Sequence, residues 1–285
     1  MGEQKFADLP YRYARVLSIA GSDSGGGAGI QADLKTIAAL GCYGMTALAA
    51  LTAQNTRGVD AIYPVSPEFL ASQIDAVARD IGVDAVKIGM LHNPEAVRVV
   101  AAAIRRYRWD RVVLDPVMVA ASGDPLITHE TIVEMVRELF PLATVITPNL
   151  DEAALLLERP LPDEAALQAA AADLAALGAP AVLLKGGHLP GPEVVDLLLQ
   201  PGQPIVRMAA PRIASRNTHG TGCTLSSAIA CHLAQGCDLA QAVGLAHDYV
   251  HRAIAAGADV QTGHGHGPLN HGHAPQAMRK FPLDC

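Results

Sequence analysis

The chain has 285 residues, of which 50% are hydrophobic and 4% aromatic, and its formal net charge is −7 at pH 7. This length and apolar content are enough for one large domain or two small ones. Nucleic-acid binding is not expected, because it needs a basic surface and the chain has no long Lys/Arg run. A membrane-spanning segment is not expected either, since no apolar run approaches ~20 residues.

The cysteine pattern indicates a reducing compartment. The five cysteines are odd in number, and no two of them form a C-x-x-C pair. This argues against both a disulfide framework and a structural zinc site. Residues 1–14 lack the hydrophobic core of a secretory signal. We therefore expect a cytoplasmic protein.

Apolar runs and helical segments alternate along the chain from Arg15 onward. Buried strands are predicted at residues 16–20, 83–88, 112–114, 145–146 and 181–184. Helices are predicted at residues 30–40, 67–80, 94–106, 129–140 and 163–177. Buried strands that alternate with helices indicate a parallel sheet covered on both faces.

The pattern changes near residue 190. Two β-like runs, 194–199 and 205–210, flank Pro201-Gly202 and predict an antiparallel hairpin at a sheet edge. Helices at 221–235 and 239–256 follow, and the remainder is rich in glycine and histidine. Without a linker, a repeat or a break in composition, we expect a single domain. Its predicted limits are residues 15–273, between an N-terminal extension (1–14) and a C-terminal tail (274–285).

A glycine-rich segment, residues 21–29, lies between a predicted strand and a predicted helix. Four glycines in the five positions 25–29 exceed the need of a flexible turn, because each one costs conformational entropy. Ligands of open α/β sheets bind at such strand-end loops. Residues 27–32 match the dinucleotide fingerprint formally, but the acidic residue expected about 20 positions later is missing. The chain has no Gly-Lys dipeptide, so it has no P-loop.

A second glycine-rich segment, residues 217–224, precedes a predicted helix. Glycines at a helix start leave backbone N–H groups pointing outward, and these groups and the helix dipole form an anion hole. Such a hole can bind the charge that develops during phosphoryl transfer. The alternative is an ordinary helix N-cap formed by Thr218 or Thr221.

The second segment carries a family resemblance. Gly220-Thr221-Gly222-Cys223 resembles the G-T-G-x signature of ribokinase-like kinases, in which the last residue is often Asp. Cysteine at that place is similar to the hydroxymethylpyrimidine/phosphomethylpyrimidine kinase branch and to some pyridoxal kinases. The resemblance covers roughly residues 16–273. Its further motifs are residues 20–23, 26–35, 52–56, 87–91, 114–118, 147–153 and 185–188.

The resemblance implies a ribokinase-like three-layer α/β/α sandwich with a mostly parallel central sheet and a small antiparallel edge hairpin. It implies ATP-dependent phosphorylation of 4-amino-5-hydroxymethyl-2-methylpyrimidine to its monophosphate and then its diphosphate, for thiamine biosynthesis. ATP and Mg²⁺ are the implied cofactors, and the implied assembly is a homodimer. A pyridoxal kinase, or an enzyme with both activities, is the alternative. A ligand-binding protein without chemistry is a further alternative, against which the intact Lys185, Asn149 and Glu152 argue.

The resemblance also assigns the acceptor side of the site. The first glycine loop and Asp33 are expected to enclose the pyrimidine. Gln54 is expected to read the base, because its amide offers both a donor and an acceptor to the ring nitrogen and the exocyclic amine. Without the motif, Gln54 could equally be an exposed turn residue. The other expected substrate contacts are Gly21, Ala28, Met90 and Val117.

Asn149 and Glu152 form an N-x-x-E pattern at a predicted strand-to-helix turn. The spacing places both side chains on one helical face, and their oxygen atoms suit Mg²⁺. The same pattern also describes a capping box. Asp115, at a strand end, is expected to share the magnesium with Glu152. The expected ATP contacts are Lys185, Asn149, Thr218, Gly220, Gly222 and Gly265.

Lys185 and Cys223 are the expected catalytic side chains. A lysine at a strand end can neutralise a transferring phosphate, although it could instead snorkel to solvent. Cys223 could deprotonate the substrate hydroxyl, because a helix N-terminus lowers the pKa of a thiol. A structural cysteine is the alternative, since the anion hole needs only backbone groups. The complete catalytic set is Gly220, Thr221, Gly222, Cys223 and Lys185.

The tail contains four histidines that could bind a metal, but solvated loop residues are the preferred interpretation. By resemblance, Gly265 and Gly267 shape the adenine side. The four histidines are His264, His266, His271 and His273.

Overall fold

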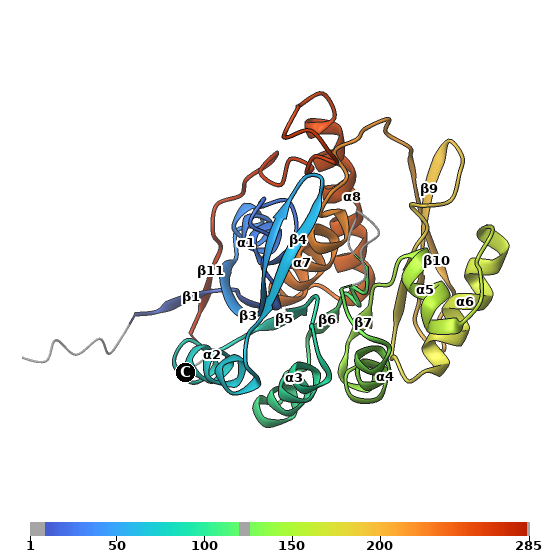
Figure 1. The fold of residues 1–285 in the computed structure, drawn as a ribbon. Helices are drawn as coiled ribbons and strands as arrows, with labels where there is room; N and C mark the ends of the chain where they lie inside the picture. The colour runs from blue at the N-terminus through green and yellow to red at the C-terminus, as the bar shows by residue number, and fades with distance from the viewer. Residues whose placement is uncertain (1–8, 120–125, 284–285) are drawn as a thin grey trace, which may run out of the picture.

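The computed structural model describes residues 9–119 and 126–283 and is built around one large twisted sheet (Figure 1). The strand order is β10-β9-β8-β7-β6-β5-β2-β3-β4. The strands are β2 (Arg15–Gly21), β3 (Tyr43–Asn55), β4 (Gly58–Pro64), β5 (Ala85–Ile88), β6 (Val112–Leu114), β7 (Val145–Ile146), β8 (Val182–Lys185), β9 (Glu193–Leu199) and β10 (Val206–Pro211).

The centre of the sheet is parallel, from β3 through β2, β5, β6 and β7 to β8. Both edges are antiparallel: β4 pairs with β3, and the β9–β10 hairpin adds to β8. The predicted edge hairpin is therefore confirmed. The pairing of β3 with β4 was not predicted, and it brings residues 52–56 to the sheet edge beside the first glycine loop.

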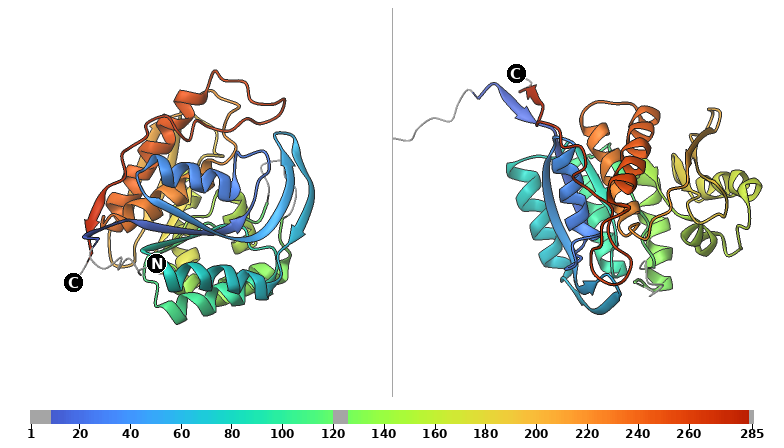
Figure 2. Two further views of the ribbon diagram at one scale, coloured as in Figure 1. Left: turned by 90° about the vertical axis from the view of Figure 1, so that its left-hand side faces the viewer. Right: turned by 90° about the horizontal axis from the view of Figure 1, so that it is seen from above.

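Helices cover both faces of the sheet (Figures 1 and 2). Along β2, Leu17 and Ile19 pack into the core under α2 to α6, whereas Val16 packs into the core under α1, α7 and α8. This is the three-layer α/β/α sandwich expected from the sequence. The helices are α1 (Gly29–Ala39), α2 (Pro67–Asp80), α3 (Pro94–Tyr107), α4 (His129–Glu138), α5 (Leu150–Leu157), α6 (Glu164–Ala176), α7 (Thr221–Ala234) and α8 (Leu239–Gly257), with a 3₁₀ turn at Phe140–Leu142.

Helix starts follow the local sequence rules. Ser66 and Asn93 cap α2 and α3 through their side chains, and a proline occupies the first turn of each helix. Asp163 likewise caps α6 by accepting from the Ala166 N–H. Helix α4 ends two residues earlier than predicted, before the 3₁₀ turn that contains Pro141.

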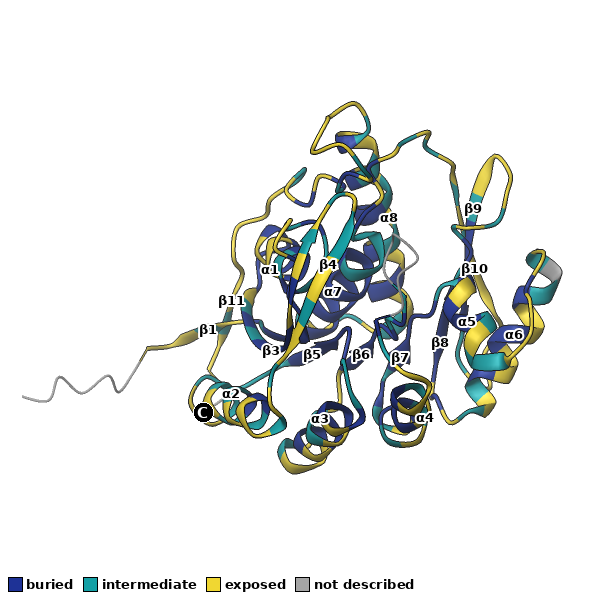
Figure 3. Ribbon diagram, viewed as in Figure 1, coloured by how far each residue is buried: buried dark blue, intermediate teal, exposed yellow. Residues whose placement is uncertain are grey.

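The inner strands are buried on both faces, as Figure 3 shows for β5 to β8, and the hairpin ends are more exposed. The first and last strands of the described residues pair with each other, because β1 (Tyr11–Tyr13) runs antiparallel to β11 (Lys280–Pro282). Within residues 9–119 and 126–283, no helix combines the length and the apolar character that crossing a bilayer requires.

Candidate active site

A cavity of about 710 Å³ opens where the parallel strands end. Each of five neighbouring strands contributes a residue at or just after its carboxyl end: Gly21 from β2, Met90 after β5, Asp115 after β6, Asn149 after β7 and Lys185 from β8. This is the usual ligand position in an open α/β sheet. The cavity extends from β3 on one side to β10 and α8 on the other.

The structure brings most of the predicted site residues together around this cavity. Two of them, Asp33 and Gly265, are not among its walls. The predicted residues that line it are Gly21, Ala28, Gln54, Met90, Asp115, Val117, Asn149, Glu152, Lys185, Thr218, Gly220, Thr221, Gly222 and Cys223.

Asp33 lies behind the cavity and is fully buried. Its carboxylate accepts hydrogen bonds from Ser18 Oγ (2.5 Å), Ser227 Oγ (2.8 Å) and Lys87 Nζ (2.9 Å). The expectation that Asp33 contacts the substrate is therefore not met. Asp33 instead forms an ion pair with the buried Lys87, which lines the cavity and was not among the predicted site residues. The sequence feature that could have indicated Lys87 is a lysine within an otherwise apolar strand.

The charges around Lys87 keep this lysine protonated. Burial alone would lower the pKa of Lys87, but the negative charges of Asp33 and Asp115 raise it well above its usual range. The charged end of Lys87, paired with Asp33, therefore lies at the wall of the cavity.

Gly265 lies against the turn between β3 and β4 and does not line the cavity. Its N–H donates to Thr56 Oγ1 at 3.1 Å, and a Cβ on Gly265 would lie 1.9 Å from the Thr56 carbonyl oxygen. The neighbouring His266 lines the cavity and donates its N–H to the same carbonyl at 2.9 Å. Residues 264–266 of the tail thus hold the β3–β4 turn beside the cavity.

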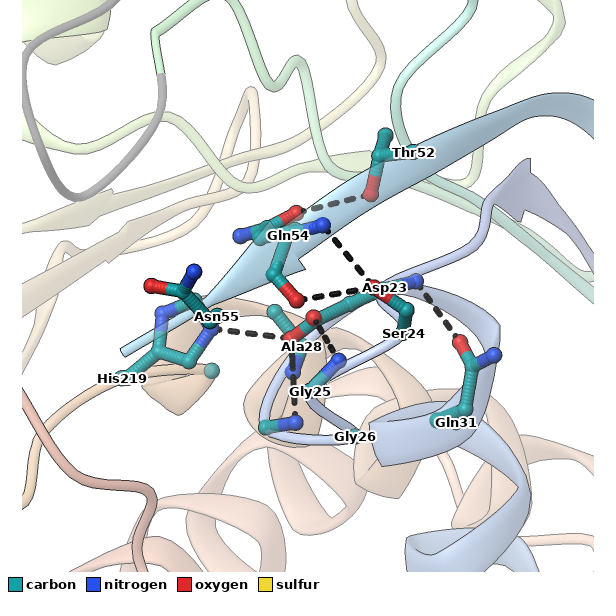
Figure 4. A network of polar contacts seen from close by, with 12 residues as sticks. Asp23, Ser24, Gly25, Gly26, Ala28, Gln31, Thr52, Gln54, Asn55 and His219 are labelled. Atoms are coloured by element: carbon teal, nitrogen blue, oxygen red, sulfur yellow. Dashed lines mark hydrogen bonds and ion pairs between the residues drawn. The ribbon is translucent and has the colours of Figure 1, made fainter. Parts of the chain in front are cut away.

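Asp23 organises the first glycine loop (Figure 4). Its carboxylate accepts from the N–H groups of Gly25 (2.8 Å), Gly27 (3.0 Å) and Ala28 (2.8 Å). It also pairs with His219 Nε2 at 2.9 Å. Burial would raise the pKa of Asp23, but the bonds from His219 and the backbone outweigh it and lower the pKa. The Asp23 carboxylate is therefore ionised.

Helix α7 begins with an open anion hole. Its N-cap is Gly220, which has a φ of 82° and provides no side-chain cap. The Thr221 hydroxyl donates backward to the Thr218 carbonyl at 2.6 Å, so the N-cap alternative is wrong. Within the described ranges, the N–H groups of Gly222 and Cys223 have no protein acceptor. These donors are available to an anion in the cavity.

Lys185 and Asp115 form an ion pair beside this hole. Lys185 Nζ lies 3.0 Å from Asp115 Oδ1, and a Cβ on Gly222 would lie 3.1 Å from the same Nζ. Burial would lower the pKa of Lys185, but Asp115 and Glu152 raise it. The lysine is therefore charged at the entrance to the hole and does not snorkel to solvent.

Asn149 and Glu152 form the capping box that the sequence allowed. The Glu152 N–H donates to Asn149 Oδ1 at 2.9 Å, and the Asn149 N–H donates to Glu152 Oε2 at 2.8 Å. Glu152 is also buried against the cavity. Burial raises the pKa of Glu152 to about 7, with Asp115 adding to the rise and Lys185 opposing it. Asp115 and Glu152 are thus two buried carboxyl groups, and the pKa of Glu152 is raised. Such a pair fits a site that gains a cation when the ligand binds.

The thiol of Cys223 does not have the lowered pKa expected at a helix start. Burial raises the pKa of Cys223 to about 11; Lys87 opposes the rise, whereas Asp33 and Asp115 add to it. The expectation of a thiolate in the free protein at neutral pH is therefore wrong. Desolvation beside two carboxylates outweighs the helix N-terminus.

The histidines of the tail divide into two groups. His264 and His266 are exposed, as expected for loop residues, but His271 is 5% exposed and burial lowers its pKa to about 4. His273 is partly buried and packs on Tyr249, with 4.7 Å between the ring centroids. The described residues contain no cluster of three or more side chains suited to a metal.

Known proteins share both the sequence and the fold. The sequence profile described as phosphomethylpyrimidine kinase matches residues 23–270. The chain belongs to this family.

Individual relatives agree with this assignment. A hydroxymethylpyrimidine/phosphomethylpyrimidine kinase of Rhizobium meliloti is 52% identical over 261 residues, which cover 91% of this chain and 97% of the relative. A thiamine biosynthesis bifunctional protein of Geobacter sulfurreducens is 50% identical over 95% of this chain and 54% of its own length. The pyridoxal kinase of Staphylococcus aureus, solved in complex with ADP, has a TM-score of 0.85 at 32% identity, covering 95% of this chain and all of that one.

The family assignment confirms the kinase interpretation of the sequence, and with it the ribokinase-like fold. Most of the predicted motif residues line one cavity, in which a phosphoryl donor and an acceptor can meet.

Proposed function

We propose that the protein transfers the γ-phosphoryl group of ATP to the hydroxymethyl oxygen of 4-amino-5-hydroxymethyl-2-methylpyrimidine, and then a second one to the phosphate of the product, for thiamine biosynthesis. The observation that carries the proposal is that one continuous cavity has two different ends. One end is apolar and carries the amide of Gln54, and the other is the anion hole with the charged Lys185. The chemistry of these two ends matches the named activities of the relatives.

The acceptor end suits a small aromatic ring. Met90 and Val117 belong to a small apolar cluster that forms one wall. Gln54 lines the same cavity from β3, and its Oε1 accepts from Thr52 Oγ1 at 3.1 Å. Its NH₂ group has no acceptor within the described residues, so it can donate to a ring nitrogen.

The donor end suits a triphosphate. The N–H groups of Gly222 and Cys223, which have no acceptor among the described residues, and the ammonium of Lys185 lie close together, so negative charge that develops between them would be stabilised. In the first reaction the hydroxymethyl oxygen bonds to the γ-phosphorus, the bond to the departing ADP oxygen breaks, and the hydroxyl proton leaves. In the second reaction a phosphate oxygen of the monophosphate is the attacking atom.

Magnesium, the compartment and the assembly are also part of the proposal. Mg²⁺ supplies charge neutralisation for the nucleotide phosphates, and Asp115 and Glu152 would hold it, through water. The described cysteines are all free thiols, which supports a cytoplasmic location. The homodimer is what the family resemblance of the sequence implies.

A substrate-panel assay tests the proposed function. Purified protein, ATP and Mg²⁺ are incubated with the hydroxymethylpyrimidine, with its monophosphate or with pyridoxal, and both ADP and the phosphorylated product are measured. We expect both pyrimidines to be phosphorylated with higher kcat/KM than pyridoxal. Transfer to pyridoxal alone would make the protein a pyridoxal kinase, and ADP release without any transfer would contradict a kinase function.

Gln54→Leu tests the base-reading role. The variant removes the amide donor, and an unpaired polar group on the bound ring costs about 1–3 kcal/mol. We therefore expect the KM for the pyrimidine to rise roughly tenfold or more, with little change in the KM for ATP. Gln73→Leu is a suitable control. Gln73, in α2, forms hydrogen bonds with the backbone of Leu48 in β3, the strand that also carries Gln54, and it does not line the cavity. Unchanged pyrimidine kinetics in Gln54→Leu would remove this residue from the site.

Glu152→Gln tests the proposed metal position. The variant keeps the size of the side chain but removes a charge, so a magnesium titration of activity should shift to higher concentration. Because the pKa of Glu152 is raised to about 7, the carboxyl gains a proton as the pH falls below neutrality. The wild-type magnesium requirement should accordingly increase below pH 7, and the variant should lose that dependence. If the magnesium titrations of the wild type and of Glu152→Gln coincide, Glu152 is only a capping residue.

A further inference from the structure

The two glycine-rich loops of the site touch each other directly. A Cβ on Gly220 would lie 1.8 Å from the Gly27 carbonyl oxygen, and a Cβ on Gly27 would lie 2.4 Å from the Cδ2 atom of His219. The loop at residues 21–29 borders the acceptor end of the cavity, and the loop at residues 217–223 carries the anion hole. Their mutual position therefore sets the position of the acceptor relative to the transferred group.

One side-chain pair joins the two loops across this contact. Asp23 Oδ2 and His219 Nε2 are 2.9 Å apart, although the residues are separated by 196 positions (Figure 4). Both residues are buried, Asp23 at 1% and His219 at 9% exposure. Because the carboxylate is ionised and can only accept, the proton of this bond lies on Nε2 of His219.

Each member of the pair is fixed on its own side. Asp23 Oδ2 also accepts from the N–H groups of Gly27 and Ala28, at 3.0 and 2.8 Å. The His219 N–H donates to the Gly267 carbonyl at 3.0 Å. Next to His219, the buried Asn217 donates from Nδ2 to the Gly257 carbonyl at 2.6 Å. The pair therefore connects two loops that are each anchored to the rest of the fold.

We propose that Asp23 and His219 are positioning residues that hold the anion hole of α7 against the acceptor loop. Both residues border the cavity, but the two Asp23 oxygens and His219 Nε2 are taken up by this pair and by backbone N–H groups, so we assign them an action through the donors of Gly222 and Cys223. The proposal rests on the kinase function proposed above. Loss of the bond lets the hole move relative to the acceptor oxygen, and a misplacement of about 1 Å can cost roughly 10²-fold in rate.

Two substitutions at His219 separate the hydrogen bond from the packing of the ring. The His219→Leu side chain fills about the same space as the imidazole ring but cannot donate a hydrogen bond. The His219→Gln side chain can place an N–H donor near the position of Nε2. We expect His219→Leu to lower kcat by about 10²-fold, with much smaller changes in KM for either substrate. His219→Gln should recover most of the lost rate. Asp23→Asn should resemble His219→Leu, and Asp23→Asn/His219→Leu should be no slower than the slower single variant.

The control variant is Lys35→Met. Lys35 Nζ donates to the Gly26 carbonyl at 2.7 Å, so it anchors the same loop, but it does not line the cavity and, among the described residues, it has no hydrogen bond to α7. Its kcat should stay close to wild type. Wild-type turnover in the same assay establishes the kinase function independently of the pair. Equal losses in His219→Leu and His219→Gln, multiplied losses in the double variant, or a rise in KM at constant kcat would each overturn the proposal.

Discussion

Lys185→Met should lower kcat by about 10²–10³-fold, the scale of removing one group that stabilises transition-state charge. Methionine keeps the unbranched stem and removes the ammonium. In the wild type, this ammonium lies 3.0 Å from Asp115 and beside Gly222 of the anion hole. The KM for ATP should rise less than kcat falls, because the backbone donors still bind the phosphates. Steady-state kinetics with varied ATP measure both quantities.

A second lysine provides the control for this variant. Lys280 lies in β11, away from the cavity, and its Nζ is 5.9 Å from the centre of the Tyr11 ring. Lys280→Met should leave kcat unchanged. If Lys185→Met instead raised the KM for ATP at constant kcat, Lys185 would contribute to ground-state binding alone. If it left both unchanged, the lysine would have only the structural role of pairing with Asp115.

The centre of the sheet was predictable from the sequence, and its β3–β4 edge was not. The runs at residues 112–114 and 145–146 are rich in Val, Ile and Leu and flanked by helices, as buried parallel strands are. In β3 (Tyr43–Asn55) the only β-branched residues are two threonines, and alanine and leucine predominate. These residues favour helix intrinsically. The strand forms because it pairs with β2 on one side and β4 on the other, which local sequence does not reveal.

The motifs indicated which residues gather at the cavity, but not which way each one faces. Asp33 lies on the face of α1 that packs on the sheet, and its partner Lys87 is 54 positions away. The pair between Asp23 and His219 is equally non-local. The pKa of Cys223 depends on burial and on charges contributed by three other elements. Such properties arise from tertiary contacts, which residue spacing along the chain does not contain.

Cys223→Ala should slow the first phosphorylation by about 10²-fold, the scale of a positioned base, and the second phosphorylation much less. The hydroxymethyl group must lose its proton as its oxygen attacks. A phosphate monoester already carries an anionic oxygen at neutral pH, because its second pKa is about 6. The anion hole should survive the substitution, since its donors are backbone N–H groups. Cys237→Ala, at a half-buried cysteine outside the cavity, is the matched control.

The raised pKa of Cys223 adds a second measurement to this prediction. With a pKa of about 11, the thiol is almost fully protonated at neutral pH. As long as the pH is below this pKa, the thiolate fraction increases about tenfold for each unit by which the pH rises. If the thiolate is the base, the wild-type rate of the first phosphorylation should rise between about pH 7 and pH 9. The Cys223→Ala variant should lose that rise, and the second phosphorylation should not show it. Equal losses in both reactions with unchanged pH profiles would mean that Cys223 shapes the anion hole and accepts no proton.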